Sequence, residues 1–327
     1  MPIRFRTAAV AVAAMAMAAI SLTACTSAMD SQNTSSGGAN AANAKDGNDP
    51  STLAIVHLPG EEQTSLSTGE KLIQKVLEKK LGMKVDYVRA TSYAATIEAQ
   101  RAGKAQVAGY GPFSYTVAKD TGVGVNVIGV MAPTKGASAF YRSVASVKAG
   151  SDITSLKQAR GKKVCFVDPL STSGYLYPTA ALLKVGFDAK KDIRPVFAGT
   201  HPASALALHS GQCDISFSTQ DTPAQLIESG QLKKGEIRQI WTSEPIPNSP
   251  VTVSSKLSPA LQNKIKNVYL KDLNVDALKA DGDCDPADKT GFCDLGGWGY
   301  VPVKDSDYNG IRAVCKATKA DACTNLG

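Results

Sequence analysis

Short apolar runs alternate with stretches of helical periodicity through residues 53–270. Within residues 69–81, for example, Leu72, Ile73, Val76 and Leu77 recur at helical spacing, and Gly82 follows where a C-cap glycine would end the helix. The same reading of the pattern predicts strands at residues 53–58, 84–88, 105–109, 125–131, 140–147, 163–167, 193–198, 213–217 and 237–241. It predicts helices at residues 69–81, 93–102, 174–185, 202–210, 222–229 and 259–270.

This alternation restarts near residue 145, which predicts two α/β lobes, each with a mostly parallel sheet flanked by helices. A chain of 327 residues is long enough for two domains. In such sheets ligands bind at the carboxyl ends of the strands, where helix N-termini converge. We therefore expect a site in a cleft between the lobes, and a cleft of that kind can close.

The N-terminus has the pattern of an export signal. Arg4 and Arg6 precede an apolar run over residues 8–20, and the first acidic residue is Asp30. The run ends in Leu-Thr-Ala-Cys at residues 22–25, a lipobox in which Cys25 is lipidated and becomes the new N-terminus. We expect residues 1–24 to be a lipoprotein signal peptide, the alternative being an ordinary signal peptide with a chance cysteine.

Residues 25–51 are rich in Ser, Asn, Ala, Gly and Asp and have no aromatic residue and no periodicity, which predicts a flexible tether. The folded body is therefore expected outside the cytoplasm, lipid-anchored on the outer face of the cell membrane or on the periplasmic side. Cleavage would remove two arginines and no acid, which lowers the formal charge from +7 to +5. That excess is modest and does not call for a polyanion such as nucleic acid as partner.

Six cysteines remain once Cys25 is assigned to lipid, and an oxidising compartment favours disulfides over metal ligands. Two pairs are close in sequence and flank short polar segments, Cys284 with Cys293 and Cys315 with Cys323. By elimination Cys165 pairs with Cys213, and both lie on or beside strand-like runs. The alternative for this last pair is two buried free thiols.

The most informative turn for chemistry is Asp-Pro-Leu-Ser-Thr-Ser-Gly at residues 168–174, which follows a strand and opens a helix. Ser171, Thr172 and Ser173 place three hydroxyl donors beside the free N–H groups and positive dipole of a helix N-terminus, and Gly174 lets backbone approach closely. This combination suits an oxyanion with several acceptor oxygens. The alternative is simple N-capping, for which one Ser or Thr suffices.

Two further turns are candidates. One carries Tyr110 in Gly-Tyr-Gly-Pro-Phe-Ser-Tyr, residues 109–115, and the other carries His201 in Gly-Thr-His-Pro, residues 199–202. For the turn with Tyr110, a role in binding and a plain strand-to-helix turn are equally good interpretations. His201 can donate a hydrogen bond to an anion, or it can merely satisfy backbone groups. No GxSxG, P-loop, HExxH or dinucleotide fingerprint occurs, so we expect no catalytic residue, no metal and no cofactor.

At these residues the chain resembles a known family, the phosphonate/phosphite/phosphate-binding lipoproteins of ABC importers. The matching pieces run through the mature body: Ala-Thr-Ser-Tyr at 90–93, Gly-Pro-Phe-Ser-Tyr at 111–115, Tyr-Arg-Ser-Val at 141–144, Ser-Thr-Ser-Gly-Tyr-Leu at 171–176 and Gly-Thr-His at 199–201. The resemblance implies the two-lobe type II periplasmic-binding-protein fold. It places lobe 1 at residues 52–143 and 246–327 and lobe 2 at residues 144–245, with two hinge crossings near residues 140–147 and 242–252.

The resemblance also implies roles for single residues. Ser171, Thr172 and Ser173 would hold a phosphorus oxyanion from lobe 2, and Tyr93 would contact it from lobe 1. His201 matches the family's element at the cleft. Tyr141 would line the cleft at the lobe crossing, and Asp221 lies where an acid can approach the substituent on phosphorus.

The implied function is capture of a phosphonate, phosphite or phosphate-like oxyanion by a monomer that delivers it to an ABC permease. Three other functions stay open on the sequence alone. They are a binding protein of the same fold for a sulfonate or a thiamine precursor, an exported phosphatase, and a cell-surface adhesin or sensor.

Overall fold

The computed structural model describes residues 49–58, 67–284, 287, 291–293 and 295–324, within one compact unit, Lys45–Gly327. The predicted signal peptide, the lipidation site Cys25 and nearly all of the predicted tether lie outside the described residues. None of the helices in the described part of the chain is both long and apolar enough to cross a membrane.

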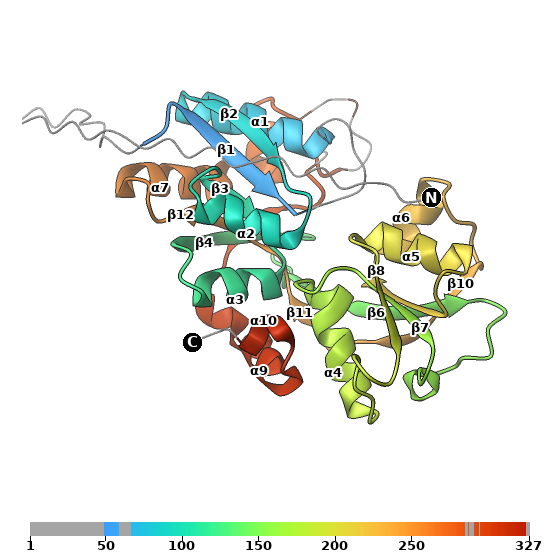
Figure 1. The fold of residues 1–327 in the computed structure, drawn as a ribbon. Coiled ribbons are helices and arrows are strands. Elements are labelled where there is room, and N and C mark those ends of the chain that lie inside the picture. The colour runs from blue at the N-terminus through green and yellow to red at the C-terminus, as the bar shows by residue number, and fades with distance from the viewer. Residues whose placement is uncertain (1–48, 59–66, 285–286, 288–290, 294, 325–327) are drawn as a thin grey trace, which may run out of the picture. The chain divides into compact units, whose positions relative to one another are not determined.

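The body has two lobes, each built on one sheet (Figure 1). Lobe 1 carries six strands in the order β13-β4-β12-β3-β1-β2, and lobe 2 carries five in the order β10-β6-β9-β7-β8. The strands of lobe 1 are β1 Thr52–His57, β2 Lys84–Arg89, β3 Val107–Gly109, β4 Val125–Ala132, β12 Pro250–Ser254 and β13 Gly299–Pro302. Those of lobe 2 are β6 Ser143–Lys148, β7 Lys163–Phe166, β8 Arg194–Phe197, β9 Ile215–Thr219 and β10 Ile237–Thr242.

Two short strands join the lobes at the crossings. β5 (Phe140–Tyr141) pairs antiparallel with β11 (Ile246–Pro247), so the two crossings lie side by side. The run predicted as one strand over residues 140–147 is therefore broken at Arg142, whose guanidinium donates to the carbonyl of Ser243 on the other crossing. The two-lobe α/β architecture is confirmed.

Most strands of each sheet run in one direction, as expected from the sequence, and each sheet also contains antiparallel strands, including β13 beside β4. β1 pairs parallel with β2 and β3, and β7 pairs parallel with β8 and β9, as strand–helix alternation requires. β12 and β6, however, are the first strands after each crossing, and they run antiparallel to their neighbours. A chain that arrives from the other lobe enters at the edge where the parallel strands end, so it must run in the opposite direction.

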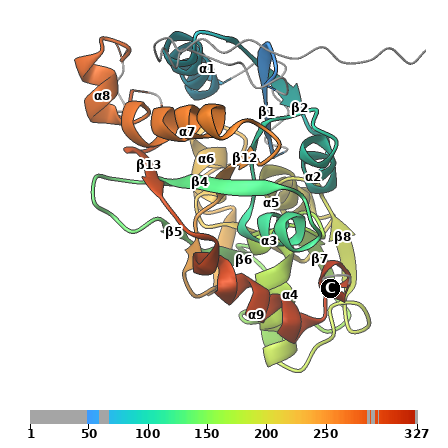
Figure 2. The ribbon, with the colours of Figure 1, turned by 90° about the vertical axis from the view of Figure 1, so that its left-hand side faces the viewer.

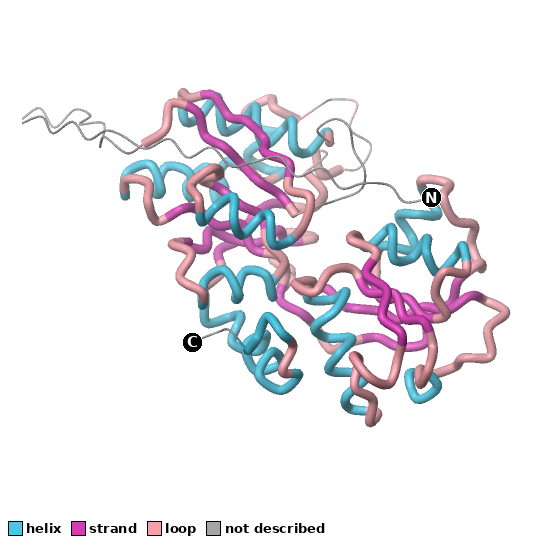
Figure 3. Tube along the Cα trace, viewed as in Figure 1, coloured by secondary structure: helices cyan, strands magenta, loops and turns pink. Residues whose placement is uncertain are grey.

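Helices cover both faces of each sheet, as the tube view in Figure 3 shows. One face of the lobe 1 sheet packs α1 and α7, whose buried residues share a core with Ile55, Val107 and Val253. The other face packs α2 and α3 in a second core that continues through the crossings into lobe 2. The main helices are α1 Thr68–Leu81, α2 Tyr93–Arg101, α3 Pro112–Asp120, α4 Tyr177–Lys184, α5 His201–Ser210, α6 Thr222–Glu228, α7 Pro259–Asn267, α8 Val275–Ala280, α9 Asn309–Thr318 and α10 Asp321–Thr324. Shorter helical turns are η1 Leu156–Gln158, η2 Thr172–Leu176, η3 Val268–Asp272 and η4 Asp305–Tyr308.

Helix α9, near the C-terminus, is a further link between the lobes. It packs against α3 of lobe 1 and against α4 and η2 of lobe 2, and Figure 2 shows it running beside α3 and α4. Buried Ile311 and Cys315 belong to the same core as Leu176 and Leu182 of lobe 2. The helix that carries the hydroxyl run is therefore supported from behind by the C-terminal segment.

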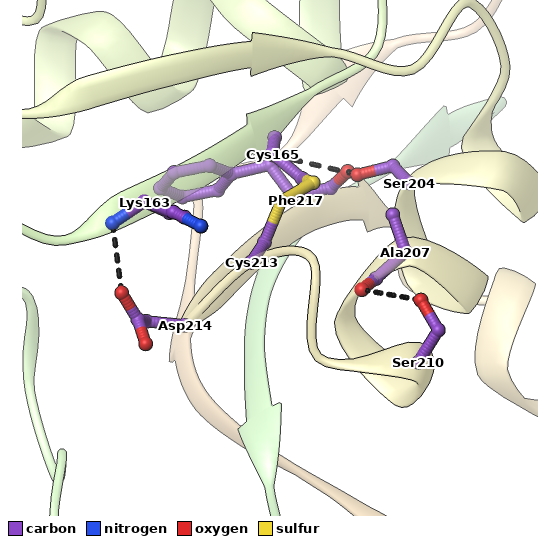
Figure 4. Close-up of a disulfide and its surroundings, with 8 residues drawn as sticks. All are labelled: Lys163, Cys165, Ser204, Ala207, Ser210, Cys213, Asp214 and Phe217. Atoms are coloured by element: carbon purple, nitrogen blue, oxygen red, sulfur yellow. Dashed lines mark hydrogen bonds between the residues drawn. A yellow bond between two sulfur atoms is a disulfide. The ribbon is translucent and has the colours of Figure 1, made fainter.

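All three expected disulfides are present: Cys165–Cys213, Cys284–Cys293 and Cys315–Cys323. The first joins β7 to the residues just before β9 (Figure 4), and both of its cysteines are buried. The structure has the bridge rather than two free thiols at this pair. The bridge closes the longest of the three loops, and its Cys165 lies in β7, the strand whose end leads into η2.

Candidate ligand-binding site

A cavity of about 290 Å³ lies between the lobes where the strands of lobe 2 end. Seven of the nine residues expected to bind ligand line it: Tyr93, Tyr141, Ser171, Thr172, Ser173, His201 and Asp221. The remaining lining residues are Leu58, Gly111, Thr219, Gln225, Asn248 and Ser249. The structure thus brings together side chains from both lobes and from the crossings.

The hydroxyl run opens a helix with a widened first turn. Ser171 is the N-cap, and its Oγ accepts from the N–H of Gly174 at 3.0 Å. Residues 172–176 form a π-helical turn before α4 begins, an uncommon geometry that occurs often at functional sites. The first N–H groups of a helix have no partner within it, so this turn presents donors toward the cavity.

Gly174 does not line the cavity, and its role is structural. A Cβ added at this position would lie 2.3 Å from Cγ2 of Val167 and 2.7 Å from Oγ of Ser171. Because residue 174 is a glycine, its backbone can pack closely against the end of β7. This contact holds the hydroxyl run at the end of the strand.

Ser173 has a buried hydroxyl that the protein leaves without a regular hydrogen bond. Its Oγ makes no hydrogen bond of regular geometry within the described part of the chain, although the residue is only 1% exposed and its hydroxyl lies close enough to the phenol of Tyr141 to affect the pKa of that phenol. Its carbonyl accepts from Oγ of Ser143 at 2.6 Å, so the backbone is fixed while the side chain is left unpaired. A buried hydroxyl without a partner costs free energy, and a bound anion would remove that cost.

Two phenols reach the cavity from the lobe 1 side, Tyr93 at the start of α2 and Tyr141 in β5. Burial raises the pKa of Tyr93 to about 12 and raises the pKa of Tyr141 beyond the usual range of a phenol. Both therefore stay protonated at neutral pH and can donate to an anion.

His201 is a neutral donor with a fixed tautomer. Its Nδ1 accepts from the backbone N–H of Thr219 at 3.2 Å, which leaves the proton on Nε2. Burial lowers the pKa of the imidazole from 6.5 to about 4, so the ring carries no charge at neutral pH. His201 thus offers one N–H donor without a permanent positive charge.

This assignment predicts that His201 will not titrate near pH 6.5. Because the pKa is lower in the folded chain than in the unfolded chain, protonation opposes folding as the pH falls from 6.5 toward 4. Nitrogen chemical shifts of the imidazole should report the Nε2–H tautomer from pH 8 down to about pH 5. A midpoint near 6.5, or an Nδ1–H tautomer, would contradict the assignment.

The cavity lining contains one carboxylate, Asp221, and no lysine or arginine. An anion bound there would be held by hydroxyl, phenol, imidazole and backbone N–H donors rather than by a cationic side chain. Helix N-termini supply further positive potential, because α2 and α5 begin at the lining residues Tyr93 and His201 and η2 begins at Thr172. The described residues include no cluster of three or more His, Cys, Asp or Glu side chains that could hold a metal ion.

Tyr110, the remaining candidate, does not reach this cavity. Its backbone N–H donates to the carbonyl of Pro250, which extends the pairing of β3 with β12, and its side chain is fully buried in the core with Ile97 and Phe113. Four residues that line the cavity were not predicted from the sequence: Thr219, Gln225, Asn248 and Ser249. For Asn248 and Ser249, the one local indication in the sequence was that two polar residues stand together at the second crossing.

The chain matches the family model described as "ABC transporter, phosphonate, periplasmic substrate-binding protein" over residues 55–308. It is 37% identical over 284 residues to the phosphate-import protein PhnD of Mycolicibacterium smegmatis, a match that covers 84% of this chain and 88% of that protein. It is 32% identical over 200 residues to the phosphonates-binding periplasmic protein of Escherichia coli, covering 59% and 58% of the two chains.

Solved structures share the fold at lower identity. The binding component of an ABC phosphonate transporter from Pseudomonas aeruginosa superposes with a TM-score of 0.72 at 23% identity, covering 85% of this chain and 91% of that one. PhnD1 of Prochlorococcus marinus, solved in complex with methylphosphonate, has a TM-score of 0.71 at 19% identity, covering 83% of this chain and 100% of that one. The chain belongs to the family of periplasmic substrate-binding proteins of ABC phosphonate transporters.

Proposed function

We propose that the cavity between the lobes captures a phosphorus oxyanion, namely phosphate, phosphite or a small phosphonate. The chain is the substrate-binding component of an ABC phosphonate/phosphate importer, and it binds its ligand without transforming it. The observation that carries the choice of ligand is the buried, unpartnered hydroxyl of Ser173 within three consecutive hydroxyl residues at a helix start. A tetrahedral oxyanion has several acceptor oxygens, which such a group of donors can bind at once.

The relatives support this choice of ligand. The Mycolicibacterium smegmatis relative is named for phosphate import, the Escherichia coli relative for phosphonates, and PhnD1 was solved with methylphosphonate. In our proposal Ser171, Thr172 and Ser173 bind the anion from lobe 2, Tyr93 and Tyr141 donate from the opposite side, and His201 donates through Nε2–H.

Asp221 places a hydrogen-bond acceptor in a site whose other side chains mostly donate hydrogen bonds. Its carboxylate lines the same cavity. A carboxylate repels an oxyanion unless the ligand offers a proton or a positive charge. We propose that Asp221 accepts from a protonated oxygen on phosphorus or contacts a cationic substituent.

There is also space for a substituent next to the proposed anion site. A second cavity of about 310 Å³ shares Leu58, Asn248 and Ser249 with the first, and its other lining residues come from lobe 1 and the second crossing. A small organic group on phosphorus could therefore extend toward β3 and β12 without displacing the donors of η2.

Calorimetric titration of the purified protein tests the proposal. Phosphate, phosphite and methylphosphonate should be tried beside an alkanesulfonate, because an alkanesulfonate-binding protein of Xanthomonas axonopodis shares the fold with a TM-score of 0.55 at 17% identity. We expect at least one phosphorus anion to bind at least 100-fold more tightly than the sulfonate. Binding of the sulfonate with no response to any phosphorus anion would overturn the proposal.

We further propose that the mature chain is a monomer anchored through lipid on Cys25 outside the cytoplasm, where it meets the permease. The lipobox at residues 22–25 supports this. Cells that express the wild-type protein should incorporate labelled fatty acid into it and retain it in the membrane fraction. Cys25→Ser should abolish the label and release the folded body, and label that persists in this variant would contradict the anchor.

A further inference from the structure

The helix α3 has no N-terminal cap of its own. Its N-cap position is Gly111, which has no side chain, and its first residue is Pro112, which has no N–H. Four other helices are capped by a hydroxyl of the preceding residue: α1 by Ser67, α2 by Ser92, α5 by Thr200 and α7 by Ser258. The first N–H of α3 that needs an acceptor is therefore that of Phe113.

That acceptor comes from the other lobe. The N–H of Phe113 donates to Oγ1 of Thr172 at 2.8 Å, and the bond is buried. Thr172 lies in η2 of lobe 2 and lines the ligand cavity, whereas α3 packs on the sheet of lobe 1. One side chain of the proposed ligand-binding site thus also caps a helix of the opposite lobe.

We propose that this inter-lobe cap favours the closed arrangement of the lobes and orients the hydroxyl of Thr172 for the ligand. Because Oγ1 accepts from Phe113, the hydroxyl proton is directed elsewhere, toward the phenol of Tyr141 and the cavity that both residues line, where an anion would accept it. Opening the lobes breaks the bond and leaves α3 without this cap. Gly111 is the position that makes the cap depend on closure, since a side-chain oxygen there would cap α3 from within lobe 1. The statement about the ligand rests on the proposed function, whereas the statement about closure does not.

The backbone at Gly111 allows the decisive substitution. Its φ of −72° and ψ of 153° suit any residue. A Cβ at this position would lie 3.5 Å from Oγ1 of Thr172 and 3.6 Å from Cε1 of Tyr93, which are ordinary contacts. Gly111→Ser therefore adds a capping oxygen to lobe 1, and Gly111→Ala adds the same Cβ without the oxygen.

The distance between the lobes should be measured by single-molecule energy transfer, without ligand, between dyes on unnatural amino acids at the exposed positions 104 and 233. A hydroxyl cap typically changes a helix equilibrium by about fivefold. We therefore expect Gly111→Ser to lower the ratio of closed to open molecules about fivefold, and Gly111→Ala to change it less than twofold. Thr172→Val should act like Gly111→Ser in this readout, and Thr172→Ser should resemble the wild type.

Equal ratios for Gly111→Ser and Gly111→Ala would overturn the proposal, because any change would then be steric. An unchanged ratio in Thr172→Val would also overturn it. Thermal unfolding of each variant confirms that the comparison is between folded proteins. If no phosphorus anion binds the wild type, the proposed function fails while the distance measurement still decides whether the inter-lobe cap controls closure.

Discussion

Replacing Ser173 by alanine should weaken binding of a phosphorus oxyanion about 10-fold to 100-fold without destabilising the free protein. The Oγ of Ser173 is buried and makes no hydrogen bond of regular geometry in the described part of the chain, so its removal costs only its weak approach to the phenol of Tyr141. A hydrogen bond to a charged group contributes about 1.5–3 kcal/mol, which sets the size of the lost affinity. An unpaired buried hydroxyl is itself unfavourable, so the free energy of unfolding should stay unchanged or rise by about 1 kcal/mol.

Ser204 is a matched control in the same lobe. It is fully buried, but its Oγ donates to the carbonyl of Phe217 at 2.9 Å. Ser204→Ala should lower the free energy of unfolding by about 1 kcal/mol and leave affinity unchanged. Titration calorimetry and urea unfolding of both variants give the two quantities. If Ser173→Ala binds its anion as tightly as the wild type, Ser173 is not a ligand donor.

Of the three disulfides, Cys165–Cys213 should be the one whose removal causes the largest loss of stability. The bridge closes a loop with a sequence separation of 48, whereas Cys315–Cys323 has a separation of 8. On the chain-entropy account, the longer loop contributes about 4 kcal/mol and the shorter about 2.5 kcal/mol. Because the longer bridge ties β7 to the start of β9, its loss should also loosen the strand that leads into η2.

The comparison requires two double variants, Cys165→Ala with Cys213→Ala and Cys315→Ala with Cys323→Ala. Guanidinium unfolding should give a loss about 1.5 kcal/mol greater for the first pair than for the second. The cavity left by two buried sulfurs adds to the first loss and does not reverse the order. An equal loss, or a greater one for the second pair, would show that loop length does not govern the contribution of these bridges.

Local pattern predicted most of the helices and much of each sheet. The residues of α1 and its Gly82 cap were read correctly, because an amphipathic helix with a left-handed glycine behind it is encoded within one stretch of chain. The five residues of β12 were missed, although all are buried at the centre of the lobe 1 sheet. Five residues give little periodicity, and Pro250 at the start resembles a loop. The direction of β12 also depends on where the chain returns from the other lobe.

The lining of the cavity was predicted where its residues are consecutive in sequence and missed where they are not. Ser171, Thr172 and Ser173 stand together, so their chemistry is visible in one motif. Asn248 and Ser249 reach the cavity only because the second crossing passes beside it. Tyr110 differs from these residues, because it lines only the second cavity and is fully buried in the core.

The central claim is that the hydroxyl run at residues 171–173 binds phosphorus oxygens between the lobes. A crystal structure grown with the tightest-binding phosphorus anion tests this most directly. The account predicts the phosphorus atom in the cavity lined by Tyr93, Tyr141 and His201, with its oxygens within hydrogen-bond distance of Oγ of Ser173 and Oγ1 of Thr172. An anion bound elsewhere, or one in the cavity held without contact to these hydroxyls, would contradict it.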